Sequence, residues 1–303
     1  MSIITKNLSK RYGEQIAVNN LNMAIKEGEI VGFLGPNGAG KSTTMKMLTG
    51  YIPPSKGEGS VCGLDIVDDS LAIRKIVGYL PEHNPLYLDM YVREFLEFAG
   101  KMGGVNKSQK RVGEVIDLTG LYQEKHKKIG QLSKGYRQRV GLAQAIIHDP
   151  DVLILDEPTG GLDPNQVIEI RELIKKLGKT TLLSTHIMQE VEAVCTRVMI
   201  IDKGDLVADS PIEDLANITG EKHQVNVTFG STINVKELNQ LNEVIHIKDK
   251  GNNRYRIEVS SAEGRKSISH FALKNNLEVM ELSSENVSLE QVFQNLTKNV
   301  DRL

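Results

Sequence analysis

Several features are scarce in this chain of 303 residues, and each absence narrows its possible roles. Its two cysteines, Cys62 and Cys195, lie far apart in the sequence, so we expect neither a disulfide framework nor a zinc site. No stretch reaches the roughly 18 apolar residues of a membrane-spanning helix. Residues 1–6 also lack the apolar run of a secretion signal. These absences favour a protein of the reducing cytosol, which would need another chain to cross a membrane.

Net charge is also scarce. The chain carries 37 Lys and Arg against 39 Asp and Glu, a formal net charge of -2, which gives no sign of a nucleic-acid-binding surface. A hydrophobic share of 40% and a charged share of 25% are ordinary for a globular protein. The length allows one large domain and a small second one.

The most specific motif that is present is Gly-Pro-Asn-Gly-Ala-Gly-Lys-Ser at residues 35–42. It fits G-x-x-x-x-G-K-[S/T], with a predicted buried strand before it at 29–34 and a predicted helix after it at 43–48. In this context backbone N–H groups and a helix N-terminus bind phosphate oxygens. Lys41 would reach the β- and γ-phosphates, and the Ser42 hydroxyl would ligate Mg²⁺. A glycine-rich turn with a chance lysine is the alternative, which a chain of this length shows about once in a hundred. We predict that the nucleotide is bound by Gly35, Pro36, Asn37, Gly38, Ala39, Gly40, Lys41, Ser42 and Thr43.

A second nucleotide motif follows at the apolar run 152–155, which ends in Asp156 and Glu157. A buried strand that delivers carboxylates beside a phosphate loop is the Walker B pattern, in which Asp156 would hold the Mg²⁺ shell through water. Glu157 is the candidate that polarises the attacking water. Alternatively, Asp156 and Glu157 could simply mark the solvated end of a strand. The presence of the phosphate loop at 35–42 makes this interpretation much less favourable.

The order of elements predicts an α/β fold. Strands at 152–155 and 181–184, with an amphipathic helix between them, predict a mostly parallel core sheet. Residues 86–148 are predicted mostly helical, and residues 197–201 and 205–208 are predicted to form a hairpin.

The pattern changes after about residue 218. A β-α-β-β-α-β order over 224–282, with a short helical piece at 235–241 and a last strand at 277–282, predicts a small ferredoxin-like α+β domain at 219–303. A final amphipathic helix is predicted through Leu289, Val292, Phe293 and Leu296. This region shows no catalytic constellation, so a packing or dimerisation module is the favoured interpretation.

Residues 132–136, Leu-Ser-Lys-Gly-Tyr, precede the Walker B strand and resemble the signature of ATP-binding cassette (ABC) proteins. The resemblance covers residues 1–218. It implies a P-loop NTPase fold with an N-terminal antiparallel β part and a helical subdomain at about 86–148. It also implies head-to-tail dimers in which the signature (Leu132, Ser133, Lys134, Gly135 and Tyr136) covers the ATP of the other copy. Ser133 can equally be an ordinary helix N-cap, and both interpretations can hold together.

Other positions agree with the family. Gly161, Leu162 and Asp163 resemble the D-loop, and His186 after the strand 181–185 matches the switch histidine that contacts the γ-phosphate. Tyr12 matches the aromatic residue that stacks on adenine, although it can also be a turn residue.

The chain departs from the family pattern in two motifs, the Q-loop and the signature. Glu82 occupies the glutamine position of the Q-loop, where a carboxylate can still reach Mg²⁺ but adds negative charge. Lys134 and Tyr136 replace the commoner glycine and glutamine of the signature. Ser133 and Gly135 are retained, so the resemblance still implies γ-phosphate capture.

The stretch 78–87 and the C-terminal domain resemble bacterial ATPase subunits of drug-, sodium- and antibiotic-export systems, and also that of the gliding-motility-associated transporter. The resemblance implies ATP hydrolysis with Mg²⁺, a second ATPase subunit as a homodimer, and a membrane-spanning permease on a separate chain. The protein would be cytoplasmic and peripheral on the inner face of the cell membrane. The permease would contact residues 82–98, where Leu86, Tyr87, Leu88, Met90 and Tyr91 form either a contact strip or helical core.

The alternative is a soluble ABC ATPase of translation or DNA repair. Such proteins usually carry two cassettes or long insertions, whereas this chain has one cassette and no basic region. A nucleotide switch without hydrolysis would need a damaged Walker B motif, but Asp156 and Glu157 are both present.

Overall fold

The computed structural model describes residues 1–106, 108–214, 223–260, 263–285 and 293. The chain divides into two compact units, Met1–Ile212 (the N-terminal unit) and Glu213–Leu303 (the C-terminal unit). The predicted boundary at residue 218 lies outside the described residues and stays a prediction. Of the predicted final helix, Leu289, Val292 and Leu296 also lie outside them.

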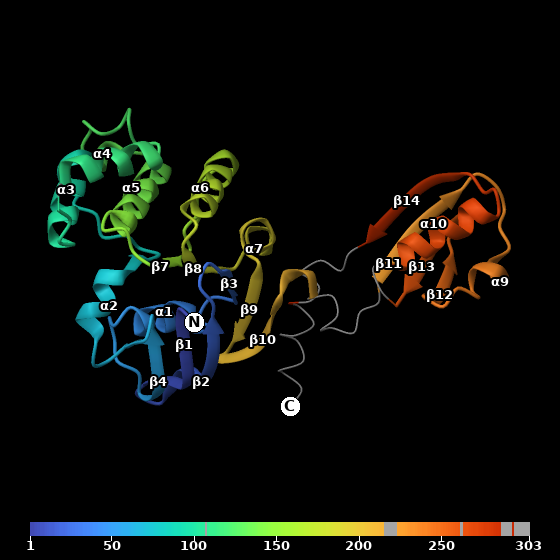
Figure 1. Cartoon of the computed structure of the whole chain (residues 1–303), viewed down its shortest axis with the longest axis horizontal. Helices are drawn as coiled ribbons and strands as arrows, with labels where there is room; N and C mark the ends of the chain where they lie inside the picture. Colours follow the sequence, from blue (N-terminus) through green and yellow to red (C-terminus); the bar gives the residue numbers. More distant parts are fainter. Residues whose placement is uncertain (107, 215–222, 261–262, 286–292, 294–303) are drawn as a thin grey trace. The chain divides into compact units, whose positions relative to one another are not determined.

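A six-stranded core sheet organises the N-terminal unit, in the order β10-β9-β3-β8-β7-β6 (Figure 1). Its strands are β3 (Ile30–Leu34), β6 (Val77–Leu80), β7 (Val152–Asp156), β8 (Thr180–Thr185), β9 (Arg197–Asp202) and β10 (Asp205–Pro211). All neighbours are parallel except β10, which pairs antiparallel with β9 as the predicted hairpin. Every residue of β7 and β8 is buried. Burial on both faces explains the apolar run of β7 before Asp156, whereas β8 buries Thr and Ser side chains on either side of Leu182 and Leu183. The predicted mostly parallel sheet is confirmed.

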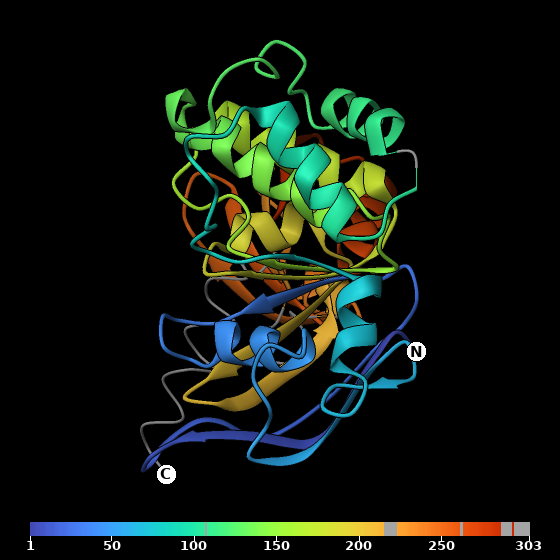
Figure 2. The same ribbon diagram turned by 90° about the vertical axis from the view of Figure 1, so that its left-hand side faces the viewer.

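A second sheet of this unit is antiparallel, in the order β2-β1-β4-β5. It comprises β1 (Ile3–Tyr12), β2 (Gln15–Ile25), β4 (Lys56–Val61) and β5 (Leu64–Asp65), and two helices accompany it, α1 (Lys41–Leu48) and α2 (Ser70–Ile76). One apolar cluster joins side chains of β1 and β2, of the core strands and of α1, including Met45 and Met47. In Figure 2, α1 lies between the core strands and the long strands β1 and β2. β4 begins at Lys56 because it pairs with β1 from Ser9↔Lys56 to Ile3↔Val61.

The predicted helical region is confirmed as α3 (Val92–Met102), α4 (Ser108–Leu118) and α5 (Lys134–Ile146). In Figure 1 these three helices gather together, away from the antiparallel sheet. Helix α3 buries Val92, Phe95 and Leu96, which recur at helical spacing and form its inner face. The unit is completed by α6 (Pro164–Leu177) after β7 and α7 (Met188–Val194) after β8.

The described part of the C-terminal unit is a four-stranded antiparallel sheet with two helices. Its elements are β11 (His223–Phe229), α9 (Val235–Leu238), β12 (Val244–Asp249), β13 (Arg254–Val259), α10 (Gly264–Lys274) and β14 (Val279–Glu285). The strand order β12-β13-β11-β14 is that of a ferredoxin-like domain, as predicted. Alternate residues Val225, Val227 and Phe229 of β11 join Ile257 and Ile268 in one apolar core.

No helix among the described residues is both long enough and apolar enough to span a membrane.

Candidate nucleotide site

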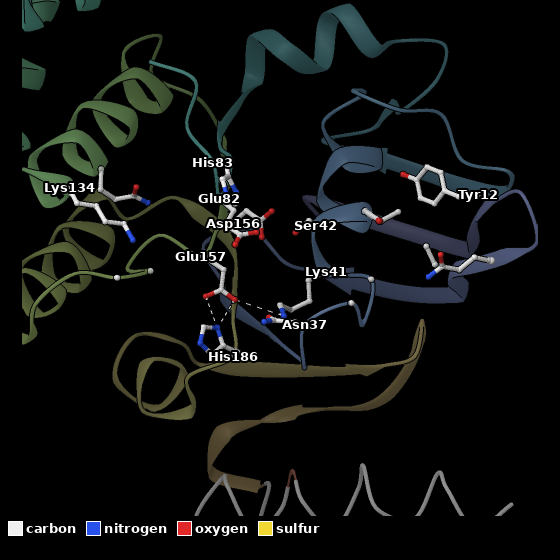
Figure 3. A pocket seen from close by; sticks show the side chains of 18 residues that line it. Tyr12, Asn37, Lys41, Ser42, Glu82, His83, Lys134, Asp156, Glu157 and His186 are labelled. Atoms are coloured by element: carbon white, nitrogen blue, oxygen red, sulfur yellow. Dashed lines mark hydrogen bonds and ion pairs between the residues drawn. The ribbon is translucent and has the colours of Figure 1, made fainter. Parts of the chain in front are cut away.

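One cavity of about 650 Å³ in the N-terminal unit gathers most of the predicted site (Figure 3). The predicted residues that line it come from six separate segments: Tyr12, Asn37, Gly38, Gly40, Lys41, Ser42, Thr43, Glu82, Lys134, Asp156, Glu157, Gly161 and His186. The other predicted residues are not part of its lining: Gly35, Pro36, Ala39, Leu132, Ser133, Gly135, Tyr136, Leu162 and Asp163.

The phosphate loop joins β3 to α1, and its shape requires glycine. Gly40 has φ 109°, and a Cβ there would lie 2.4 Å from the carbonyl oxygen of Ala17. Gly38, with φ 81°, also lies in the left-handed region that favours glycine. The chain can therefore curl here and start α1 directly at Lys41, so that the helix N-terminus faces the cavity.

Lys41 is the buried cation of the cavity, with 6% of its surface exposed. Its Nζ donates to the carbonyl oxygens of Gly35 at 2.6 Å and Pro36 at 3.1 Å. Burial lowers the pKa of Lys41, while the charges of Glu157, Asp156 and Glu82 oppose that shift. The loop thus holds an ammonium group at the place where phosphate oxygens would be received.

The end of β7 presents two carboxylates in different settings. Asp156 is buried and accepts a hydrogen bond of 2.5 Å from Ser184 Oγ, which orients it. Glu157 has φ 50°, an uncommon conformation for a side chain of this size. Its backbone N–H donates to the carbonyl oxygen of Ser184 at 3.2 Å and to Ser184 Oγ at 3.1 Å. Strained backbone of this kind persists where the surroundings hold it and clusters at functional sites.

Glu157 faces His186 and Lys41. His186 Nδ1 lies 3.0 Å from both Glu157 carboxylate oxygens, and Lys41 Nζ lies 3.9 Å from Oε1 (Figure 3). Burial raises the pKa of Glu157, and the hydrogen bond from His186 and the charges of His186 and Lys41 oppose the shift. A carboxylate with a raised pKa is a stronger base, which suits a group that accepts a proton from water.

Three oxygen-bearing side chains share the same part of the cavity wall. Ser42, Glu82 and Asp156 line the main cavity and also border a second cavity of about 410 Å³. They come from the start of α1, from the loop after β6 and from the end of β7. The structure therefore brings together the three predicted metal ligands.

The signature and the D-loop meet within one chain. Ser133 is the N-cap of α5, and its Oγ accepts from Tyr136 N at 3.4 Å, so the N-cap interpretation holds. The Lys134 ammonium lies against Gly161, where an added Cβ would be 2.0 Å from Nζ. Asp163 caps α6 by accepting from Gln166 N at 3.0 Å.

Sequence reasoning missed five other cavity-lining residues, Gln15, Ala17, His83, Gln138 and Gly160. His83 and Gly160 adjoin predicted residues, so their motifs could have indicated them. Gln15, Ala17 and Gln138 carry no local signal, because only the sheet pairing and the position of α5 bring them here.

The predicted contact strip (Leu86, Tyr87, Leu88, Met90 and Tyr91) follows β6 and is partly exposed at the surface. Tyr87, Leu88 and Tyr91 are 57%, 52% and 47% exposed, which favours a contact surface over helical core for these three. Tyr87 packs edge-on against Phe95 and Phe98, with ring centroids 6.1 and 6.0 Å away. Leu86 and Met90 are half-buried.

Comparison with known proteins agrees with this geometry. The family model described as "ABC transporter" matches residues 18–160. The linearmycin resistance ATP-binding protein LnrL of Bacillus subtilis (strain 168) is 33% identical over 302 residues, which are 96% of this chain and 97% of that protein. The chain belongs to the ABC transporter ATP-binding proteins. This ABC ATPase hydrolyses ATP for transport.

Two further similarities extend the comparison. The Nod factor export ATP-binding protein I of Burkholderia orbicola (strain AU 1054) is 40% identical over 209 residues, 67% of this chain and 69% of that protein. A dimeric ATP-binding cassette in a post-hydrolysis state, bound to ADP and Pi, is 28% identical. It covers 69% of this chain and 98% of its own, with a TM-score of 0.64. The predicted gliding-motility system gains no support from these relatives.

Proposed function

We propose that this ABC ATPase powers export through a permease on a separate chain. The observation that carries the proposal is the convergence of Lys41, Asp156, Glu157 and His186, from separate segments, on one cavity. Support for export comes from the similarity to the Nod factor export protein, and the drug-resistance name of LnrL agrees with it.

The cavity residues predicted from the sequence would divide the work of binding and hydrolysis. Tyr12, 49% exposed at the end of β1, would stack on adenine, and residues 35–43 would bind the phosphates. Glu157 would orient and deprotonate the attacking water, and His186 would contact the γ-phosphate while keeping Glu157 in place. Lys41 would neutralise charge that develops on the phosphate oxygens.

The donor set fits Mg²⁺. Ser42, Glu82 and Asp156 offer a hydroxyl and two carboxylates, the hard oxygen ligands that Mg²⁺ prefers together with phosphates and waters. Among the described residues, no group of three or more His, Cys, Asp or Glu side chains could hold a metal. When bound together with the nucleotide, such an ion would offset negative charge on the phosphates.

Two copies would act together. Ser133 and the Gly135 N–H stand at the N-terminus of α5, which favours anions. We infer that residues 132–136 of one copy cover the ATP of the other, and that Gly161, Leu162 and Asp163 connect the two sites. A homodimer is the simplest assembly of this kind.

The permease would contact residues 82–98. Tyr87, Leu88 and Tyr91 expose apolar and aromatic surface there, and the Q-loop residue Glu82 links this surface to the cavity. The protein would then work on the inner face of the cell membrane. A cassette of translation or DNA repair would instead need a partner of ribosomal or nucleic-acid type.

A pull-down from native membranes tests the proposal. The bait is tagged Glu157→Gln protein with ATP, and wild-type protein without ATP is the matched control. We expect a stoichiometric multi-span membrane protein, identified by mass spectrometry and retained more strongly by the variant. Ribosomal or nucleic-acid partners without such a membrane protein would contradict the proposal.

A further inference from the structure

A buried carboxylate outside the cavity connects the two loops that carry its catalytic candidates. Glu190, in the first turn of α7, is 2% exposed and does not line the cavity. Its Oε1 accepts a short hydrogen bond from Thr159 Oγ1, in the turn after β7. Its Oε2 accepts from Thr185 Oγ1 at 2.7 Å, at the end of β8.

Both threonines stand next to the reacting groups. Thr159 follows Glu157 by two residues, and the turn between them closes with a bond of 3.0 Å from Gly160 N to the carbonyl oxygen of Glu157. Thr185 precedes His186, and its Oγ1 also accepts from Ile187 N at 3.0 Å. His186 is therefore held on both sides by a chain of hydrogen bonds that ends at Glu190.

Burying this carboxylate carries a cost that apolar packing would avoid. The nearest cation described for it, Arg171 Nη2 on α6, lies 3.9 Å from Oε1. With the cation this far away, the Glu190 carboxylate is held mainly by its two hydroxyl donors. Buried ion pairs are in any case weak evidence of a stabilising role. Thr159 and Thr185 are themselves buried, so their hydroxyls are committed to this carboxylate.

We propose that Glu190 is a positioning residue for ATP hydrolysis, whose two carboxylate oxygens fix the Glu157 turn and the His186 loop relative to each other. It does so through Thr159 and Thr185, without contact with the nucleotide. The strained Glu157 backbone, with φ 50°, is then held on one side by Ser184 and on the other by Thr159. The inference rests on the proposed function, in which Glu157 and His186 act on the water and the γ-phosphate.

The first test is Glu190→Gln, which keeps the side-chain shape but leaves one oxygen in place of two. We expect kcat for ATP hydrolysis to fall by about 10- to 100-fold, since small misplacements of reacting groups cost this much. ATP affinity, measured with a fluorescent analogue, should change by less than about twofold, because Glu190 does not reach the cavity. Asp209→Asn is the matched control: it removes a carboxylate that pairs with Arg197 at 2.6 Å, away from the cavity, and should keep the wild-type kcat.

A threonine pair keeps the proposal testable if Glu190→Gln does not fold. Thr159→Val removes the hydroxyl and keeps the shape, whereas Thr159→Ser keeps the hydroxyl. We expect the valine variant to lose kcat like Glu190→Gln and the serine variant to stay within about threefold of wild type. The double variant of Glu190→Gln and Thr159→Val should lose no more than the worse single variant.

Each other outcome overturns the proposal. Equal kcat in the valine and serine variants would show that the Thr159 hydroxyl has no positioning role. A loss of ATP affinity that matches the loss of kcat would show a general structural role for Glu190. If the wild-type protein hydrolyses no ATP, the proposed function itself is wrong. That result differs from one in which Glu190→Gln keeps the wild-type kcat, which would contradict only the positioning role of Glu190.

Discussion

The two units of this chain are built on different principles. In the N-terminal unit, charged side chains such as Lys41, Asp156 and Glu190 are buried beside or behind one cavity. Among the side chains of the C-terminal unit whose burial the structure describes, no charged one is buried. Its core consists of apolar and aromatic side chains on one face of the sheet. Both units use alternating or periodic apolar residues to fold, but among the side chains that the structure describes, the buried charged groups belong to the N-terminal unit.

This difference between the units indicates which part of the chain carries the chemistry. Burying a charge lowers stability unless partners hold it, so a cluster of such groups indicates selection for chemistry. The C-terminal unit shows the opposite, a core that packing alone explains. Five predictions test this contrast, beginning with the largest expected effect.

Lys41→Ala should abolish detectable ATP binding, a loss of at least about 10³-fold, because it removes the buried cation of the phosphate loop. Titration with a fluorescent ATP analogue measures it. Lys46→Ala, in the last turn of the same helix, is the matched control and should keep most of the affinity. Affinity retained in Lys41→Ala would contradict the assignment of the whole site.

Glu157→Gln should slow ATP hydrolysis by about 10²–10⁴-fold while sparing ATP binding, because the amide cannot accept the proton of the attacking water. Phosphate release at saturating ATP measures the rate. A wild-type rate in this variant would show that another residue positions the water.

Ile257→Ala tests the other side of the comparison. Ile257 is fully buried in the C-terminal unit, so its truncation should lower the free energy of unfolding of that unit by about 2–5 kcal/mol. Urea unfolding measures this loss. ATP affinity should stay at the wild-type value, and a parallel loss of affinity would break the contrast between the units.

Leu88→Glu should weaken retention of the permease by at least about tenfold in the membrane pull-down, because a charge would replace exposed apolar surface in the contact region. ATP binding and the circular-dichroism melt should be unchanged. Leu71→Glu, at a 73% exposed leucine on α2, is the matched control and should leave retention intact. Collapse of the melt in Leu88→Glu would contradict the surface role.

The smallest effect concerns pH. Burial raises the pKa of Glu157 in the folded state, so between the unfolded and folded pKa values the folded protein binds more protons than the unfolded chain. The free energy of unfolding must then fall as pH rises through that window. Glu157→Gln should lack this fall, which urea unfolding without nucleotide at a series of pH values measures. A variant whose pH dependence follows wild type would contradict the raised pKa.

Much of both units was predictable, because the decisive patterns are local. The phosphate loop, the apolar strand before Asp156 and the order of the C-terminal strands all appear within short windows of sequence. The Glu190 network was missed, since its members Thr159, Arg171, Thr185 and Glu190 come together only through the packing of α6 and α7 beside β7 and β8. A glutamate four residues after His186 was a weak signal for it.

The ends of strands and helices were the hardest features to predict, because they depend on strand pairing and packing between segments that are distant in the sequence. β14 was predicted at residues 277–282, but it runs from Val279 to Glu285 alongside β11. The helical piece predicted at 235–241 ends at Leu238. In both cases apolar residues such as Leu241 and Leu277 pack against the core from outside the regular element.

Hydrogen–deuterium exchange on the full chain carrying Glu157→Gln, with and without ATP and Mg²⁺, tests the central claim most directly. That claim is that the nucleotide binds in the cavity of the N-terminal unit. The account predicts that ATP protects the backbone amides of residues 35–43 and of the segments around Glu157 and His186. Unprotected amides at residues 35–43 in the presence of bound ATP would contradict it.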